Sequence, residues 1–516
     1  MVAAPSSANS AAHTSEIELK LEFAPADASR LVSHPALAPN VAPPEERELV
    51  STYFDTPDCA LHKAGLYLRV REIDGRFLQT IKAAKGGAGI LERYEWEHEL
   101  VDRRPDLDAA RGTALEPFLT AKVRAALQPI FETRIQRRTH RFRSGDTEIE
   151  AAFDRGAIST KVQTCPICEL ELELKLGDRR ELFRLARTIA KDIPLRLEIK
   201  TKAERGFELY GKRRLEAEKA LPVHIPPTMP AAEAFRLIAL SCLRQIVANE
   251  PAVCAGHTEA LHQMRIGVRR LRAAIAIFSG LVDGETLKRV KAELRWIMGQ
   301  LGPARELDVF AADVLEPLRA GRSDDPRAAA LQRDFEQKRK EAYAAAGAAI
   351  QSERFRAVVL DLAEWIETGA YPDGRRKAEA GPVAEYVRAR LAKLRKRIKR
   401  KGAELRHLSV EDQHRLRIAA KRLRYATEFF ASTFPGERAE ARRSETLKTL
   451  KELQDSLGGL NDLATHRSLM VSHAGAATKH TVLSRIAGGE RAETLLRKAE
   501  QAFARFAAVK PFWKAS

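Results

Sequence analysis

Cysteine, aromatic residues and long apolar stretches are scarce in this chain. Five cysteines among 516 residues are too few for a disulfide framework, and Cys165 and Cys168 form a lone C-x-x-C without a second pair at zinc spacing. We therefore expect plain reduced thiols. No uncharged apolar run is long enough to span a bilayer, and residues 1–14 lack the basic start and apolar core of a signal peptide. These absences predict a cytoplasmic protein with a disordered leader.

The usual motifs of nucleotide binding and covalent catalysis are also missing. The sequence has no P-loop, no G-x-G-x-x-G, and no Ser/His/Asp or Cys/His arrangement. The glycines of Gly86-Gly-Ala-Gly89 are not followed by Lys-Ser or Lys-Thr, so we expect a hairpin loop there. For an enzyme of this composition, a metal-assisted reaction without a covalent intermediate is favoured.

Positive charge is abundant but unevenly distributed. Residues 1–230 carry 36 Lys and Arg against 35 Asp and Glu, a net charge of +1, whereas residues 231–516 carry 52 against 35, a net charge of +17. The second half therefore attracts polyanions. Because aromatic residues make up only 6% of the chain, base stacking on single-stranded nucleic acid is disfavoured. A polyanion without bases fits better.

Charged residues recur at every second position in several segments of the first half. Alternate side chains of a strand share one face, so Glu16, Glu18 and Lys20 are expected on one side, with Ile17 and Leu19 on the other. The same spacing groups Arg69 with Arg71, Arg93 with Glu95, Glu97 and Glu99, Glu169 with Glu171, Glu173 and Lys175, and Lys200 with Lys202.

Five such segments between residues 16 and 202 predict a closed sheet whose charges line an interior. A charged interior of mixed sign is costly unless it binds something equally charged. Carboxylates at alternate positions suit a hard divalent cation, and Arg and Lys suit phosphate oxygens. The pattern therefore predicts a metal-dependent polyphosphate site.

Short strand-like segments separated by turn signals predict an α+β domain over residues 15–215. Asp74-Gly75 predicts a hairpin turn. The proline-rich segment within residues 216–230 continues neither periodic structure and is the expected linker. The expected strands are 66–70, 77–81, 91–100, 134–142, 149–153, 169–176 and 195–200, and helical spacing interrupts them at about 113–127 and 179–191.

From residue 231 onward a periodicity of 3.6 residues replaces the strand signals, and the sequence repeats itself. An all-α domain over residues 231–512, built from two repeated helical bundles, is predicted. The repeats are His262-x2-Arg265-x3-Arg269-x2-Arg272 with His414-x2-Arg417-x3-Lys421-x2-Arg424, and Leu301-Gly302-x2-Arg305-Glu306-Leu307 with Leu457-Gly458-x2-Asn461-Asp462-Leu463.

On a helix each repeated basic set falls within a stripe roughly 80° wide, opposite apolar residues such as Met264, Val268 and Leu271. One such stripe is usually a solvated face neutralised by acidic neighbours. A duplicated stripe in a half of charge +17 instead favours an anionic partner. Because no H-x3-H or E-x-x-H accompanies His262 or His414, a capping or phosphate-facing role is favoured over metal binding.

With these residues in place, the first half resembles the CYTH family of triphosphate tunnel enzymes, whose E-x-E-x-K signature matches Glu16, Glu18 and Lys20. The second half resembles the CHAD domain, a helical domain associated with inorganic polyphosphate. The pairing is similar to the CYTH–CHAD inorganic triphosphatases of bacteria, over nearly all of residues 15–510. Supporting motifs are Arg69-x-Arg71 after Leu66 and Leu68, R-x-E-x-E at 93–97, E-x-E-x-E at 169–173 and Lys202-x2-Arg205-Gly206.

The resemblance implies an antiparallel β-barrel that forms a tunnel, with Mg²⁺ or Mn²⁺ as cofactor. It implies metal binding by Glu16, Glu18, Asp154, Glu169, Glu171 and Glu173. It implies phosphate binding and catalysis by Lys20, Arg69, Arg71, Lys82, Arg93, Glu95, Arg137 and Lys202. The polyphosphate-binding residues would be His262, Arg265, Arg269, Arg270, Arg272, His414, Arg417, Lys421, Arg422 and Arg424.

The implied function is hydrolysis of inorganic triphosphate to pyrophosphate and phosphate, with polyphosphate as the partner of the helical half. An inactive tunnel in a polyphosphate-associated structural protein, located at polyphosphate granules, is one alternative. ATP, as in class IV adenylate cyclases, or thiamine triphosphate is an alternative substrate, and either needs a ring-sized pocket to which Tyr94 and Trp96 could contribute. Since Trp96 falls on the face opposite Glu95 and Glu97, we expect it to pack outside the tunnel. Neither membrane nor nucleic acid is an expected partner.

Overall fold

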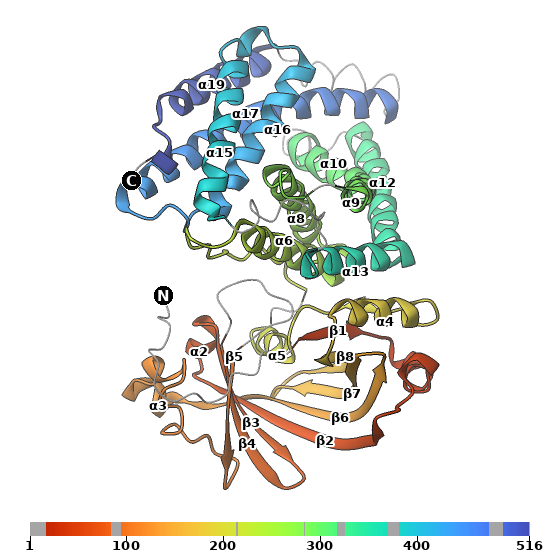
Figure 1. Ribbon diagram of the computed structural model, residues 1–516. Helices are drawn as coiled ribbons and strands as arrows, with labels where there is room; N and C mark the ends of the chain where they lie inside the picture. The colour runs from red at the N-terminus through yellow and green to blue at the C-terminus, as the bar shows by residue number, and fades with distance from the viewer. Residues whose placement is uncertain are drawn as a thin grey trace. The chain divides into compact units, whose positions relative to one another are not determined.

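The computed structural model describes residues 17–83, 94–212, 215–282, 284–316, 326–369, 381–473 and 489–514 (Figure 1). The expected leader and the loop at Gly86–Gly89 lie outside these residues. The chain divides into two compact units. Unit 1 comprises residues 1–219, 243–260 and 350–368, and unit 2 comprises residues 220–242, 261–349 and 369–516.

Unit 1 is built on one antiparallel sheet of nine described strands in the order β5-β4-β3-β2-β6-β7-β8-β1-β9. Among the described strands, no pairing joins β5 to β9, so the barrel closure expected from the sequence is not seen in the hydrogen bonds. The strands are β1 (Glu18–Glu22), β2 (Ala42–Asp55), β3 (Leu66–Ile73), β4 (Arg76–Ala83), β5 (Tyr94–Leu100), β6 (Gln128–Ser144), β7 (Thr147–Ser159), β8 (Thr164–Leu176) and β9 (Arg196–Leu197).

Most expected strands are confirmed, and Asp74 and Gly75 take the positive φ values of a tight hairpin. The expected strand 195–200 is wrong beyond residue 197, and Lys200 and Lys202 therefore share no strand face. Lys202 instead begins helix α5 (Lys202–Tyr210), because Thr201 and Glu204 form a capping box: Thr201 Oγ1 accepts from the Glu204 N–H at 3.0 Å, and the Glu204 carboxylate accepts from the Thr201 N–H at 2.8 Å.

The helix expected over 113–127 is also shorter than predicted. Its described part is a 3-10 turn at Glu116–Phe118 followed by α3 (Ala121–Ala126). The helix expected over 179–191 is confirmed as α4 (Arg180–Ala190). Unit 1 further contains α1 (Ala28–Val32), α2 (Ala60–Lys63), α7 (Glu250–Cys254) and α13 (Glu353–Glu367).

One face of the sheet is apolar and covered by α4. Leu19 and Leu21 of β1 pair with Leu172 and Leu170 of β8, and all four side chains are fully buried. Helix α4 lies against β8 with its own buried stripe of Leu182, Phe183, Ala186 and Ile189. Because side chains alternate along a strand, the charged neighbours of these leucines face the other side.

Helix α5 packs on that other face. Its residues Ala203, Phe207 and Leu209 share one buried cluster with Phe131 and Ile135 of β6. Phe131, Thr133, Ile135 and Arg141 are each an even number of positions from Arg137 along β6. Their side chains therefore point to the same face of the sheet as Arg137. The apolar side of α5 therefore anchors the helix on the charged face and directs Lys202 and Arg205 toward it.

Unit 2 is helical in its described residues. Among the buried side chains of α8 are Met264, Val268, Leu271 and Ile275, which confirms the apolar side of the first repeat. The helices that lie wholly or mainly in this unit are α6 (Ala231–Val247), α8 (Thr258–Ile277), α9 (Glu285–Gln300), α10 (Gly302–Phe310), α12 (Pro326–Gln351), α15 (Val383–Gly402), α16 (Val410–Phe429), α17 (Glu437–His473) and α19 (Gly489–Ala508).

Both copies of the repeat place a glycine against the matching arginine. A Cβ added at Gly302 would lie 3.7 Å from Arg265 Nη1, and one added at Gly458 would lie 3.2 Å from Arg417 Nη2. The two segments differ in continuity, because Gly302 begins α10 whereas Gly458 lies within α17. The duplication of whole bundles stays a prediction from the sequence.

The packing of α5 against the sheet can be tested at Gly206. A Cβ there would lie 2.1 Å from the Phe131 ring, so Gly206→Ala forces the helix off the sheet and should lower the free energy of unfolding by about 1–3 kcal/mol. Thermal or denaturant unfolding measures the change.

Gly299→Ala is the matched control, because no atom lies within 4 Å of its added Cβ and alanine favours the helix. It should leave stability unchanged or raise it by up to about 1 kcal/mol. Equal stability of the Gly206→Ala variant and the parent protein would show that α5 is not seated this way.

Candidate functional site

The strand register collects acids and bases from every part of the sheet onto one face. Directly opposed residues of an antiparallel pair point to the same side, so each pair extends the face by one strand. On one half of the sheet the pairs are Glu18 with Glu173, Lys20 with Glu171, Glu22 with Glu169, Glu169 with Asp154, and Asp154 with Arg137. On the other half they are Ser51 with Arg71, Tyr53 with Arg69, Arg69 with Thr80, Lys82 with Glu95, and Thr80 with Glu97.

This face is curved rather than flat, because residues on distant strands influence one another. Six strand spacings separate β4 from β1, which would be about 29 Å in a flat sheet. Burial is the largest effect on both groups and lowers the pKa of Lys82 but raises that of Glu95, whereas Lys20 on β1 lowers both values. Charges about 29 Å apart would be screened by salt, so the face must bring β1 and β4 together.

Three buried carboxylates lie at the centre of the face. Asp154, Glu169 and Glu171 are 0%, 1% and 8% exposed, and each offers an oxygen within 4.8 Å of the other two. They come from the neighbouring strands β7 and β8. Three hard oxygen donors at this separation fit the ligand preference of Mg²⁺ or Mn²⁺.

Lys202 and Arg137 balance the charge of these carboxylates. Lys202 Nζ lies 2.8 Å from Asp154, 2.6 Å from Glu169 and 2.7 Å from Glu171. Arg137 donates to both Asp154 oxygens at 2.7 Å, in a bidentate pair, and also donates to Glu171. Glu169 Oε2 is buried and makes no contact with hydrogen-bond geometry, although Lys202 lies close to it.

The electrostatics of the cluster keep Glu171 and Asp154 charged. Burial alone would raise the pKa of Glu171, but Lys202, Lys20 and Arg137 hold it well below its usual value. Burial also raises the pKa of Asp154, but the nearby charges, chiefly Lys202, bring it below its usual value. Glu18 behaves differently, because burial and then the nearby Glu171 raise its pKa to about 7.

The other half of the face is cationic. Arg69 is 8% exposed, and its Nε has no hydrogen-bond partner among the described residues. Burial, with Arg69 beside it, lowers the pKa of Arg71 to about 9, and Arg71 Nε donates to Ser51 Oγ at 3.0 Å. Burial and Arg69 also lower the pKa of Lys82 to about 7, although Lys82 pairs with Glu95. Buried cations that repel one another are suited to receive an anion.

The structure brings most of the sequence-predicted residues to this face, including Asp154 and Arg137 at its centre. Glu173 lies on the face but outside the three-carboxylate group, and it pairs with Lys175 at 2.7 Å. Lys200 pairs with Glu208 and Glu218 instead. Glu16 and Arg93 lie outside the described residues.

Sequence reasoning missed Arg205 and Glu198 as members of the site. Arg205 Nη1 donates to Glu169 Oε1 at 2.6 Å and lies 3.7 Å from Glu198 Oε2. The signal was the spacing of three residues between Lys202 and Arg205, which places both on one side of a helix. It could be used only once Lys202 was known to begin a helix.

The repeated basic residues of unit 2 also approach one another. Burial, followed by Arg417 and Arg269, lowers the pKa of Lys421 to about 7. Burial and then Arg269 lower the pKa of Arg265 to about 10. Arg269 of α8 thus influences residues of α16, so the two helices present their basic residues to a shared region.

Several of these guanidinium groups have unused donors. The Nε atoms of Arg265, Arg269 and Arg417 are buried without a hydrogen-bond partner among the described residues. The Nε atoms of Arg270 and Arg424 also lack a hydrogen-bond partner among the described residues, but both side chains reach Glu428, and Arg270 lies over the Phe429 ring. Arg272, Arg422, His262 and His414 lie on the same two helices, and His414 is exposed.

Among the described residues, none of the helices combines the length and hydropathy required to cross a bilayer. The five cysteines are all free thiols, as expected.

Two family models match the chain: the CYTH domain over residues 14–207 and the CHAD domain over residues 237–471. A Haemophilus influenzae protein described as an inorganic triphosphatase is 33% identical over 202 residues. That match covers 39% of this chain and 56% of the relative, so the chain spans little more than half of the relative's length.

Solved structures similar to the chain include the CHAD domain of the plant Ricinus communis, with 28% identity and a TM-score of 0.47, covering 57% of this chain and 98% of that one. Another, from Hippeastrum, is described as a putative adenylyl cyclase with a dominant triphosphatase activity; it has 18% identity and a TM-score of 0.30, covering 39% and 97%. With both family models matched in succession, the chain belongs to the proteins that join a CYTH domain to a CHAD domain.

Proposed function

We propose that unit 1 hydrolyses inorganic triphosphate to pyrophosphate and phosphate, with a divalent metal ion, in a tunnel enclosed by the curled sheet. The observation that carries this proposal is the buried group Asp154, Glu169 and Glu171, which shares its face with the buried Arg69 and the half-buried Arg71. A metal–triphosphate complex needs both kinds of contact. The description of the Haemophilus influenzae relative supports the choice of reaction.

The three carboxylates, with Glu18 and the sequence-predicted Glu16, would hold Mg²⁺ or Mn²⁺. When bound, such an ion would neutralise phosphate oxygens and lower the pKa of a water molecule. Glu171 and Asp154 stay ionised, so the protein presents these ligands already charged. Arg205 and Lys202 hold Glu169 in place through its two oxygens, and so preorganise the group.

The cationic side chains position the phosphate chain and stabilise the leaving pyrophosphate. Arg69 offers a buried, unpaired Nε–H, and the planar guanidinium of Arg71 suits two phosphate oxygens. Burial and Arg69 lower the pKa of Lys82 to about 7, so a bound polyanion would favour its charged form, whereas Arg71, with a pKa of about 9, is charged at neutral pH before any ligand binds. Hydrolysis of a phosphoanhydride requires little more than this positioning and charge stabilisation.

The position of Trp96 favours inorganic triphosphate over ATP or thiamine triphosphate. Trp96 pairs with Ile81 in the β4–β5 register, and both contribute to an apolar cluster with Leu66 and Leu68. These residues alternate with Lys82 and Glu95 and lie on the opposite face. Trp96 therefore offers no stacking surface for a base or a thiamine ring inside the tunnel.

We also propose that unit 2 binds inorganic polyphosphate between α8 and α16. The supporting observation is that buried Nε atoms of Arg265, Arg269 and Arg417 lack partners, although buried donors are normally satisfied. Besides burial, Arg417 and Arg269 lower the pKa of Lys421, which indicates repulsion that a polyanion would relieve. Such binding would also place the protein at polyphosphate granules.

Glu171→Gln tests the hydrolytic site. The neutral amide removes one metal ligand and one of the charged partners of Lys202 and Arg137, so metal-dependent phosphate release from triphosphate should fall at least 100-fold. Glu173→Gln is the matched control on the same strand and face, and it should lose less than tenfold because Glu173 pairs with Lys175 outside the group. Equal losses in both variants, or none in Glu171→Gln, would contradict the proposed metal site.

Polyphosphate binding is tested with two double variants of equal charge. Arg269→Gln/Arg417→Gln removes donors from the shared basic region and should weaken binding of labelled polyphosphate at least tenfold. Arg491→Gln/Arg497→Gln removes two exposed arginines of α19 and should change binding less than twofold. Competition by RNA and heparin, measured on the full chain, reports specificity. Equal weakening by both pairs, or displacement by RNA at lower concentrations than by polyphosphate, would contradict the proposal.

A further inference from the structure

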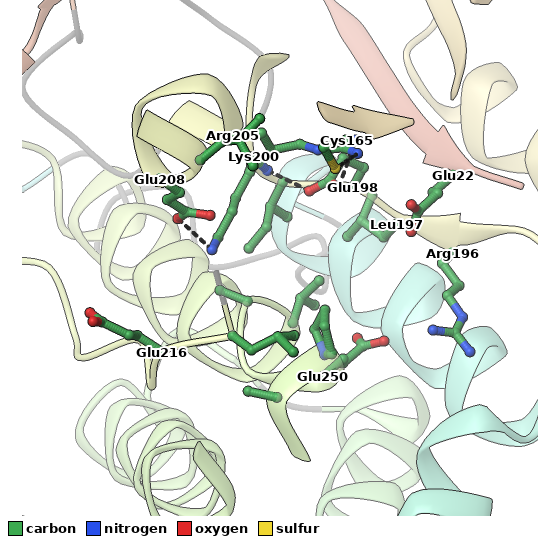
Figure 2. Close-up of a pocket in the computed structure, with 17 residues that line it drawn as sticks. Glu22, Cys165, Arg196, Leu197, Glu198, Lys200, Arg205, Glu208, Glu216 and Glu250 are labelled. Carbon is green, nitrogen blue, oxygen red and sulfur yellow. Dashed lines mark hydrogen bonds and ion pairs between the residues drawn. The ribbon is translucent and has the colours of Figure 1, made fainter. Parts of the chain in front are cut away.

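Unit 1 contains a second polar cavity, of about 270 Å³, lined by residues of β1, β9, α5 and α7 and the segments around them (Figure 2). Every lining residue belongs to unit 1. Asp154, Glu169 and Glu171 do not line it, so it is distinct from the carboxylate group described above. Its charged lining residues are Glu22, Glu198, Glu208, Glu216 and Glu250 with Arg196, Lys200 and Arg205.

The cavity is acidic in a basic protein. Five carboxylates and three cations give its lining a net charge of −2, in a chain of net charge +18. Two of the cations are already paired: Lys200 lies 2.6 Å from Glu208, and Arg205 lies 2.6 Å from Glu169, outside the lining. The lining thus has an excess of negative charge that its own cations do not neutralise.

Glu250 is the residue that most clearly lacks a partner. It is 7% exposed, and its side chain makes no hydrogen bond or ion pair within the part of the chain that the structure describes, although Arg196 and Arg356 are near enough to lower its pKa. Figure 2 places it in the cavity wall, on the side of Arg196. Burial raises the pKa of Glu250 to about 8, Arg196 opposes that effect, and Glu198 and Glu22 raise the pKa further. A buried carboxylate without a partner is costly, and a bound cation would remove the cost.

The arrangement does not fit a single metal ion. Within the described residues, the group whose ligand atoms converge within 4.8 Å is Asp154, Glu169 and Glu171. Glu22, Glu198 and Glu250 form no such group, so their negative charges are spread along the cavity. The remaining wall is apolar and includes Leu197, Ile199, Leu209, Val247 and Ala252.

We propose that this cavity binds a linear polyammonium ion, a di- or triamine, with its ammonium groups at Glu250 and at the Glu22–Glu198 side and its methylene groups against the apolar wall. An ammonium group donates up to three hydrogen bonds, which suits a carboxylate that has none. An alkyl chain matches Leu197 and Val247, whereas a hydrated metal ion would leave them in contact with water. The cavity adjoins the proposed triphosphate site, because Arg205 lines it and also binds Glu169, but cation binding in the cavity does not require triphosphate hydrolysis.

Isothermal titration of the full chain with spermidine, in metal-free buffer, tests the proposal. We expect one bound spermidine per chain, and Glu250→Gln should weaken binding at least tenfold. Asp146→Asn removes an exposed carboxylate in the β6–β7 turn and should change the affinity less than twofold. Glu22→Gln, on strand β1 rather than helix α7, should also weaken binding and is the variant to use if Glu250→Gln fails to fold.

Three results would overturn the proposal. The first is absence of saturable spermidine binding. The second is equal affinity in the parent protein, Glu250→Gln and Glu22→Gln, which would indicate diffuse attraction to surface carboxylates. The third is displacement of spermidine by equimolar Mg²⁺ with loss of the Glu250 dependence, which would indicate a metal site. Triphosphate hydrolysis is not a readout in this experiment, so failure here leaves the proposed hydrolytic function untouched.

Discussion

Mutual neutralisation of buried charges on one face of a β-sheet is the constraint on which the rest of unit 1 depends. Asp154, Glu169 and Glu171 are almost completely removed from solvent, and burial of unpaired carboxylates would cost several kcal/mol each, on the order of magnitude known for buried ions. Lys202, Arg137 and Arg205 offset that cost through short contacts from α5 and β6. The helix must therefore sit where its apolar side meets Phe131, or the acids lose their partners.

The two units use charge in opposite ways. In unit 1 the carboxylates and their cationic partners are held in close pairs, which fixes the side chains before any ligand arrives. In unit 2 the repeated Arg265, Arg269 and Arg417 are half-buried near one another, and they have buried Nε atoms without a hydrogen-bond partner among the described residues. The first arrangement suits a small complex of metal and phosphate, and the second suits a long polyanion that supplies many oxygens.

Alternation along the strands was sufficient to predict which charges share a face, because a period of two residues survives any tertiary context. It failed at Lys200 and Lys202, where Thr201 and Glu204 cap a helix and break the period. That capping signal is present in the sequence but was outweighed by the charge pattern. Strand register, which places Lys20 opposite Glu171, and the pairing of Arg205 with Glu169 depend on contacts far apart in the chain. Local patterns carry no information about such contacts. The position of α5 on the sheet, and with it the contact between Arg205 and Glu198, is determined by tertiary packing alone.

The most direct measurement of the central claim is a substrate panel on the full chain: inorganic triphosphate, ATP, thiamine triphosphate, long polyphosphate and pyrophosphate, each with Mg²⁺, with Mn²⁺ and with chelator. A face of buried acids and bases without a ring-stacking surface predicts fast, metal-dependent release of phosphate and pyrophosphate from triphosphate, and slow or absent turnover of the nucleotide and thiamine esters. Turnover of ATP alone to cyclic AMP, or triphosphate hydrolysis that persists unchanged in chelator, would contradict the account.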